Sequence, residues 1–250
     1  MDSKASKKKV SGSAKFTEHA VDLLKRDYPN SRFNKYDDAR DGPQLVDVNS
    51  QRYEQLSNRI HQTFANCEIS QIRQVYAPHM YAMYMLRCEE MKLIVGQNKV
   101  KKLILYHVTT ESRALESLES GLDWRRTRRA KFGCGVSFSD DADYANFYAD
   151  NSLGGTRVIM ICSVLVRKKY DIPAEDNGDS LIVPPGRADT TVSHNGRVYV
   201  KYNDYDFYPK YFVYYTRRSE HMTESKYFRG NTRRARSMGL VGSMRAMNLY

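Results

Sequence analysis

The segment Val158–Val166, which reads VIMICSVLV, constrains the fold of this chain more than any other feature. A short apolar run rich in β-branched residues is typical of a β-strand. The segments Lys102–Val108, Arg197–Tyr202 and Tyr211–Tyr215 have the composition of further strands. The sequence therefore predicts a sheet that is built mainly from the second half of the chain.

Helices are predicted mainly in the first half. They are expected over residues 16–27, 51–66, 81–96 and 112–119. In the second of these, Leu56, Ile60 and Phe64 recur at helical spacing and form one apolar face. Two strands, Gln44–Asn49 and Ile69–Val75, are predicted between the helices. Because helices and strands do not alternate as βαβ units, the pattern predicts an α+β fold and argues against a Rossmann sheet.

The net charge of +11 is concentrated at the two ends of the chain. Residues 1–15 contribute +4 and residues 217–250 contribute +6, which leaves +1 for everything between them. Basic ends of this kind are either solvated segments that aid solubility or sites of non-specific attraction to nucleic acid. The expected division is a basic N-terminal tail with a short helix, a folded domain and a basic C-terminal tail, over 1–44, 45–218 and 219–250.

The remaining composition excludes several classes of protein. Hydrophobic residues make up 41% of the 250 residues, which is enough for a packed core. No apolar run reaches the length of about 18 residues that spans a bilayer, and we expect no membrane contact. The lysine-rich N-terminus is not followed by an apolar segment, so we expect no secretory signal. We expect an intracellular protein, of the nucleus or cytoplasm, with no metal site and with reduced thiols at Cys67, Cys88, Cys134 and Cys162.

The segment Lys131–Asp150, which reads KFGCGVSFSDDADYANFYAD, has the character of a binding segment. Glycine has no Cβ, so Gly133 and Gly135 allow the backbone to approach a ligand or another strand closely. This is not the GxGxxG pattern of a dinucleotide-binding loop. Tyr144 and Tyr148 lie four residues apart and share a face if the segment continues as a helix.

Five segments of the chain occur in a recognisable order. In this order they resemble the catalytic domain of the poly(ADP-ribose) polymerase (PARP) superfamily, most closely its mono-ADP-ribosylating members. The family motifs L-F-H-G-T and Y-G-K-G-x-Y-F-A-x-D-A are among those matched, and the resemblance covers the chain from about Val46 to Arg217. The five segments are Ile69–Tyr84, Leu105–Thr109 (LYHVT), Leu122–Arg125 (LDWR), Phe132–Ala149 (FGCGVSFSDDADYANFYA), and Pro184-Pro185 with Arg197–Tyr215 (RVYVKYNDYDFYPKYFVYY).

The resemblance implies a fold, a co-substrate and a set of site residues. The fold is the α+β ADP-ribosyltransferase fold, a split antiparallel β-sheet with flanking helices. The co-substrate is NAD⁺, whose nicotinamide would stack on Tyr148, whose carboxamide would meet the backbone of Val108 and whose adenosine ribose would be held by His107. The family's His-Tyr-Glu catalytic positions fall at His107, Ser137 and Val198. The cofactor-binding positions are His107, Val108, Thr109, Gly135, Tyr144, Ala145 and Tyr148.

Four of these positions depart from the family pattern. Ser137 stands in place of the triad tyrosine, and Val198 in place of the glutamate. Ala145 and Val108 replace a serine and a glycine that bind the carboxamide. Each lost hydrogen bond to a buried ligand group costs about 1–3 kcal/mol. Because valine cannot polarise an acceptor hydroxyl, we expect no elongation of an ADP-ribose chain.

Two functions are therefore open at the level of the sequence. The first is an NAD⁺-dependent protein mono-ADP-ribosyltransferase with an unidentified target protein. The second is an inactive PARP-fold pseudoenzyme that serves as an interaction module, with its basic tails contacting nucleic acid or protein partners. NAD⁺ binding separates the two.

Overall fold

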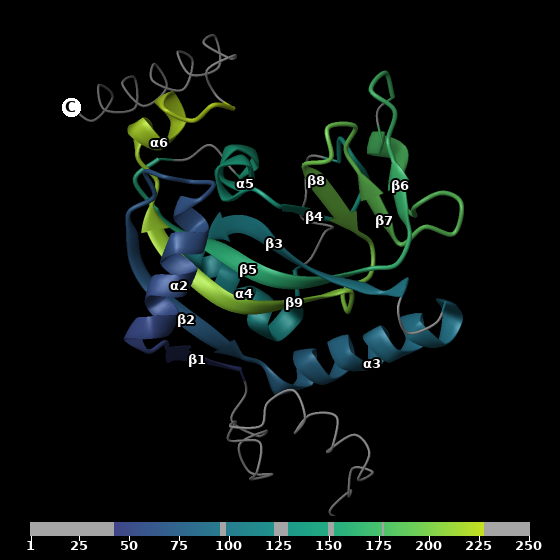
Figure 1. Ribbon diagram of the computed structural model, residues 1–250, viewed down its shortest axis with the longest axis horizontal. Helices are drawn as coiled ribbons and strands as arrows, with labels where there is room; N and C mark the ends of the chain where they lie inside the picture. The colour runs from purple at the N-terminus through teal and green to yellow at the C-terminus, as the bar shows by residue number, and fades with distance from the viewer. Residues whose placement is uncertain (1–42, 96–98, 123–129, 150–152, 177, 228–250) are drawn as a thin grey trace, which may run out of the picture. The chain divides into compact units, whose positions relative to one another are not determined.

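The structure is a computed structural model that describes residues 43–95, 99–122, 130–149, 153–176 and 178–227. The described helices and strands all belong to one unit of the chain, Asp41–Tyr250 (Figure 1). Their order is β1 (Gln44–Asp47), α2 (Ser50–His61), β2 (Ile69–Tyr76), α3 (Pro78–Val95), β3 (Lys101–Thr110), α4 (Glu111–Ser120), β4 (Val136–Ser139), α5 (Ala142–Tyr148), β5 (Thr156–Val166), β6 (Lys169–Asp171), the 3-10 turn η5 (Gly178–Ser180), β7 (Thr190–Val192), β8 (Val198–Lys201), β9 (Phe207–Thr216) and α6 (Ser219–Thr223).

The described strands form one nine-stranded sheet with the order β1-β2-β9-β5-β3-β4-β8-β7-β6. Neighbouring strands are antiparallel except for β6 and β7, which pair in parallel. The predicted strand Val158–Val166 forms most of β5, which pairs along its length with β3 and with β9. The predicted α+β class is confirmed, and the sheet is antiparallel in all but one of its pairs.

The sheet consists of two halves that meet at a single residue pair. Strands β3 and β4 pair through Tyr106 and Ser139, whereas β3 pairs with β5 from Lys101 to Thr110. The larger half contains β1, β2, β9, β5 and β3, and the smaller half contains β4, β8, β7 and β6 (Figure 1). Beyond Tyr106, no described strand pairs with the edge of β3 that faces the smaller half.

The core of the larger half lies between its strands and the helices α2 and α5. Helix α2 begins at an N-cap, because the Asn49 side chain accepts a hydrogen bond of 2.8 Å from the Arg52 N–H. Full burial of a leucine or isoleucine side chain contributes about 1.5–3 kcal/mol. The main members of this core are Leu56, Ile60, Phe64, Ile72, Tyr106, Val108, Ala142, Ala145, Ile159, Ile161, Val213 and Tyr215.

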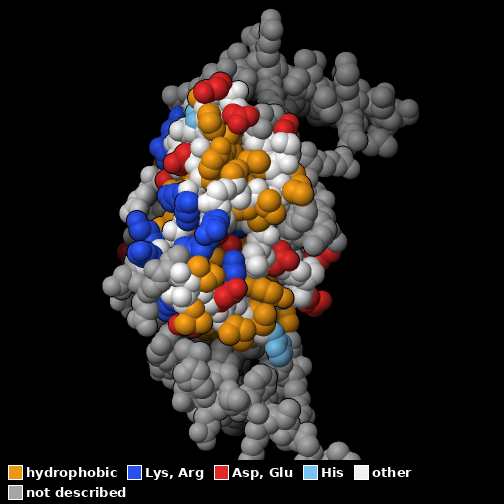
Figure 2. All heavy atoms as spheres, turned by 90° about the vertical axis from the view of Figure 1, so that its right-hand side faces the viewer, with side chains coloured by type: hydrophobic (Ala, Val, Ile, Leu, Met, Phe, Trp, Pro, Cys, Tyr) orange, Lys and Arg blue, Asp and Glu red, His pale blue; other side chains and the backbone are white. Residues whose placement is uncertain are grey.

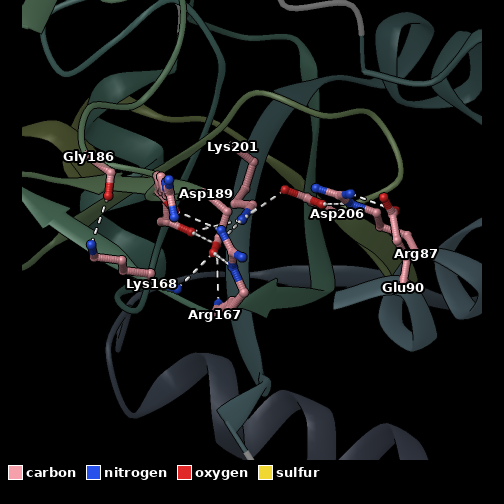
Figure 3. A network of polar contacts seen from close by, with 10 residues as sticks. Arg87, Glu90, Arg167, Lys168, Gly186, Asp189, Lys201 and Asp206 are labelled. Carbon is pink, nitrogen blue, oxygen red and sulfur yellow. Dashed lines mark hydrogen bonds and ion pairs between the residues drawn. The ribbon is translucent and has the colours of Figure 1, made fainter. Parts of the chain in front are cut away.

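A buried cluster of charged side chains connects the two halves (Figure 3). Lys201, at the end of β8, has a fully buried side chain. Its Nζ lies 2.8 Å from Asp189 Oδ1, next to β7, and 2.9 Å from Asp206 Oδ2, next to β9. Arg87 of α3 binds Asp206 at 2.8 Å, and Arg167 binds Asp189 at 3.3 Å. The cluster therefore holds α3 and strands of both halves in one arrangement.

Each buried charge of this cluster is opposed by another. Burial alone would raise the pKa of the Asp189 carboxyl, but Lys201 outweighs it and lowers that pKa to about 2. The Lys201 Nζ also donates to Thr190 Oγ1 at 2.8 Å. A buried ion pair adds little stability over an apolar pair, but removing one partner leaves an unpaired buried charge. The cluster is therefore more important for specifying the arrangement than for adding net stability.

The prediction that the C-terminal tail begins at residue 219 is wrong for residues 219–227. Helix α6 buries His221 and Met222 against the larger half. The His221 ring contacts Phe64 edge-on, with ring centroids 5.2 Å apart, and its Nε2 donates to the Asn66 carbonyl at 3.1 Å. The charge of this segment indicated a solvated tail, but a few apolar and aromatic residues were enough to fold its first part onto the domain.

The other predicted boundaries differ by smaller amounts. The helix expected over 51–66 ends at His61, because the N–H groups of Thr63 and Phe64 both bond to the Ile60 carbonyl. The short strands β4, β6 and β7 were not predicted from the sequence. The helix predicted over 16–27 and most of the LDWR motif lie outside the described residues.

Hydrophobic side chains reach the surface on one face of the domain. Figure 2 shows them above and below a band of lysine and arginine side chains. Helix α3 is apolar on more than one face and leaves Leu86, Leu93 and Ile94 exposed. Within the described parts of the chain, no helix combines the length and the hydropathy needed to cross a membrane. The four cysteines are free.

We predict that Lys201→Met lowers the free energy of unfolding by about 3–5 kcal/mol, because it leaves Asp189 and Asp206 buried without their shared cation. The control is Lys101→Met at an exposed position of β3, which we expect to change stability by less than about 0.5 kcal/mol. Urea denaturation of both variants measures the difference. A loss below about 1 kcal/mol for Lys201→Met would contradict the role assigned to the cluster.

Candidate functional site

A hydrogen bond joins His107 and Ser137 across the junction of the two halves. His107 lies on β3 and Ser137 on β4, and His107 Nδ1 lies 2.9 Å from the Ser137 carbonyl oxygen. A carbonyl only accepts hydrogen bonds, so Nδ1 carries the proton and Nε2 of the neutral ring is an acceptor. Burial lowers the pKa of His107, against the opposing effect of the bond to Ser137. The ring is therefore neutral at pH 7 and offers an acceptor atom.

The positions of Ser137 and Val198 lie on one face of the smaller half. Strands β4 and β8 pair in the register Ser137 with Val200 and Ser139 with Val198. Paired residues and residues two apart on a strand share a face of the sheet. The side chain of Val198 is buried in an apolar cluster with Val200 and Tyr144. Position 198, which the sequence resemblance predicted to be a catalytic position, is therefore part of a closed apolar surface.

Helix α5 spans the junction and contributes to both cores. Asp141 Oδ1 accepts a hydrogen bond of 3.1 Å from the Tyr144 N–H and so caps the helix. Ala142 and Ala145 pack into the core of the larger half. Tyr144, on another face of the helix, packs into the cluster of the smaller half that contains Val198. The spacing of small and aromatic residues on this helix thus matches the two surfaces that it contacts.

The aromatic residues of α5 form a continuous group. The rings of Tyr144 and Tyr148 have centroids 4.7 Å apart, and Phe147 contacts Tyr148 edge-on at 5.0 Å. Burial and the neighbouring Tyr148 raise the pKa of Tyr144, which stays protonated. Tyr148 is 39% exposed, so its ring is available to a ligand. The pair that the sequence placed on one helical face is therefore in contact.

The remaining predicted residues have structural explanations. Val108 is buried in the same core as Ala145 and pairs with Ile159 of β5. Thr109 is buried. A Cβ added to Gly135 would lie 2.3 Å from the Lys201 carbonyl oxygen, so glycine here permits the close approach of β4 to β8.

The structure adds residues to the site that were not predicted from the sequence. Tyr227 follows α6 and packs edge-on against Tyr144, with centroids 4.7 Å apart and the planes at 74°. Its hydroxyl donates to Asp141 Oδ2, and the ammonium of Lys226 lies 3.1 Å from the same oxygen. In the sequence, the indication of a packed segment was that an aromatic residue, Tyr227, lies close to Met222 among residues that are mostly charged or polar.

A polar groove of about 460 Å³ lies elsewhere on the domain, beside β1 and α2. Its arginine, Arg52, is already engaged, because it donates two hydrogen bonds to the Tyr211 hydroxyl at 3.0 and 2.8 Å. None of the predicted site residues lines it. The lining residues are Asp47, Val48, Asn49, Gln51, Arg52, Gln55, Gln74 and Tyr211.

Comparison with known proteins adds no assignment to this geometry. No family model matches the chain, and no curated protein is significantly similar to it. Within the described residues, no three histidine, cysteine or acidic side chains are grouped so as to hold a metal ion. The function is therefore argued from the residues at the junction.

Asp143 on α5 provides a pH-dependent test of how this site is packed. Its Oδ2 accepts a hydrogen bond of 2.8 Å from Ser225 Oγ, while its Oδ1 is buried with no hydrogen-bond partner among the described residues. Burial raises the pKa of Asp143 to about 6, against the bond from Ser225 and with the help of Asp141. The folded state therefore binds this proton more tightly than the unfolded state, in which the pKa is about 3.9.

We predict that this carboxyl lowers the stability of the protein as the pH rises from about 4 through about 6. Asp143→Asn cannot ionise, so its stability relative to the native protein should rise by about 1–2 kcal/mol between pH 4 and pH 8. Urea denaturation at both pH values measures this. Asp171→Asn, at an exposed position, is the control and should show no such change. A difference between Asp143→Asn and the native protein that is independent of pH would contradict the prediction.

Proposed function

We propose that the domain is an NAD⁺-dependent protein mono-ADP-ribosyltransferase of the PARP family with the ADP-ribosyltransferase fold. The observation that carries the proposal is the His107–Ser137 hydrogen bond where the two halves of the sheet separate. It leaves Nε2 of a neutral histidine as an acceptor, which suits a ribose hydroxyl. The exposed ring of Tyr148 on α5 suits the flat nicotinamide.

Some of the predicted site residues have side chains that suit NAD⁺, and others do not. His107 and Tyr148 supply a hydrogen-bond acceptor and a stacking surface. Ala145 and Val198 supply neither a donor nor an acceptor from their side chains, so the carboxamide and the reacting ribose depend on backbone groups. The backbone of Val108, on β3, is the source we propose for them. We therefore expect weak binding of NAD⁺.

The proposed reaction breaks the bond between nicotinamide and the ribose C1 and forms a bond from C1 to a nucleophile of the target protein. Nicotinamide leaves with the electron pair of the broken bond and becomes neutral. In this chain the contribution of the protein is positioning, through His107 and Tyr148, rather than proton transfer. Val198 has no atom that can take a proton from the acceptor, so the target must supply an ionised or otherwise activated group.

The apolar surface around Val198 favours a second function. Val198 and Tyr144 are buried together, and Tyr227 packs on the same cluster. A site closed in this way is expected of a pseudoenzyme that uses the fold as an interaction module, with the basic ends of the chain contacting nucleic acid or a protein partner. Binding of NAD⁺ decides between the two functions.

We predict that the native protein binds NAD⁺ and that Tyr148→Ala weakens this binding about tenfold, because the stacking surface for nicotinamide is lost. Isothermal titration calorimetry measures both dissociation constants. Tyr205→Ala removes a tyrosine of similar exposure from the loop between β8 and β9, and it should leave the affinity unchanged. If the native protein shows no binding at millimolar NAD⁺, the transferase is refuted and the interaction module remains as the candidate function.

We also predict that any modification stops at one ADP-ribose for each acceptor residue. The buried valine at position 198 cannot polarise a ribose hydroxyl to extend a chain. Incubation with labelled NAD⁺, followed by gel electrophoresis, should give a discrete labelled band. A high-molecular-weight ladder that is removed by a poly(ADP-ribose)-degrading enzyme would show that elongation occurs and would refute this prediction.

A further inference from the structure

The residues Ser225–Tyr227, which we call the strap, lie against α5 at the candidate site. Each of the three contacts an acidic residue near the start of that helix. Ser225 Oγ donates to Asp143 Oδ2 at 2.8 Å, while Lys226 and Tyr227 both reach Asp141 Oδ2. The strap is therefore attached to one short segment of the domain by several polar contacts.

Asp141 links the strap to the frame of the site. This residue is 1% exposed, and its two oxygens have separate uses. Oδ1 caps α5, and Oδ2 receives the Tyr227 hydroxyl and lies 3.6 Å from Arg197 Nη1, next to β8. A buried carboxylate requires several donors to offset the loss of hydration. Residues of α5 and next to β8 supply only some of the donors that the Asp141 carboxylate requires, and the strap supplies the others.

The ring of Tyr227 covers the apolar part of the site. It contacts Tyr144 edge-on at 4.7 Å and packs on the cluster that contains Val198 and Val200. Val198 occupies the position at which the acceptor group would approach the reacting ribose under the proposed function. Tyr227 therefore lies on the same apolar cluster as Val198.

The strap is held separately from the element that precedes it. Helix α6 is fixed by the bond from His221 to the Asn66 carbonyl and by the contact of His221 with Phe64. The strap makes its own contacts with α5: Ser225 donates to Asp143, Tyr227 donates to Asp141, and the ammonium of Lys226, a side chain that is 59% exposed, lies beside Asp141. These contacts of the strap share no residue with those that fix α6, so the two segments are anchored independently.

We propose that the strap is an autoinhibitory cover of the candidate site, closing the acceptor side beside Val198 when it is docked on α5 and opening it when it leaves. This inference rests on the proposed function. It assigns the regulation of the site to the chain itself, through Tyr227 as the occluding side chain and Asp141 as its anchor. Release of the strap raises transfer from NAD⁺ without changing the fold of the domain.

The test compares the full-length native chain with Tyr227→Ala and with Lys226→Glu, which places a negative charge beside Asp141 on an exposed side chain and so preserves folding. Lys101→Glu is the charge-matched control at an exposed position. Hydrogen exchange of the α5 amides reports docking of the strap. Calorimetry reports NAD⁺ binding, and release of nicotinamide from NAD⁺ with water as the acceptor reports turnover.

The proposal expects faster exchange of the α5 amides in both strap variants, with nicotinamide release raised about fivefold or more and the control unchanged. Faster exchange without any change in nicotinamide release or NAD⁺ affinity overturns the proposal and leaves the proposed function intact. Unchanged exchange in both variants also overturns it, because the strap is then not docked in solution. If neither the native chain nor a variant binds NAD⁺, the proposed function fails and this inference fails with it.

Discussion

The fold depends on one fully buried ammonium group. Lys201 lies between Asp189, next to β7, and Asp206, next to β9, and these strands belong to opposite halves of the sheet. A one-residue shift of a strand moves every side chain to the other face of the sheet. Such a shift would place Lys201 on the apolar face of Val198 and Val200 and take the shared cation away from Asp189 and Asp206, which costs several kcal/mol. The cluster thus specifies how the smaller half is attached to the larger one.

This attachment produces the candidate site. Because a single residue pair joins β3 to β4, the two halves separate beyond Tyr106. The separation leaves an edge of β3 that no described strand pairs with, and His107 reaches across it to the Ser137 carbonyl. Helix α5 then closes the junction, with its alanines against one half and Tyr144 against the other. A continuous sheet would have used these backbone groups for strand pairing.

The changes in the predicted catalytic positions and the presence of the strap concern the same surface. Valine at position 198 makes the surface apolar, and an apolar surface exposed to water is covered when a suitable side chain is available. Tyr227 supplies that side chain, and Asp141 satisfies its hydroxyl. Val198 and the aromatic strap are therefore compatible parts of one arrangement.

The sequence by itself determined the elements whose pattern is local and long. Strand β5 follows from its apolar run, α2 from the spacing of Leu56 and Ile60, and the α+β class from the order of the elements. Strands β4, β6 and β7 have only three or four residues each, too few for a periodic pattern, and they form because partner strands supply their hydrogen bonds. The assignment of His107 and Tyr148 to a binding site came from the sequence and stays a prediction. The contact of Tyr227 with Tyr144 and the burial of Lys201 were decided only by the tertiary structure, because both join residues that are distant along the chain and neither residue type indicates its partner.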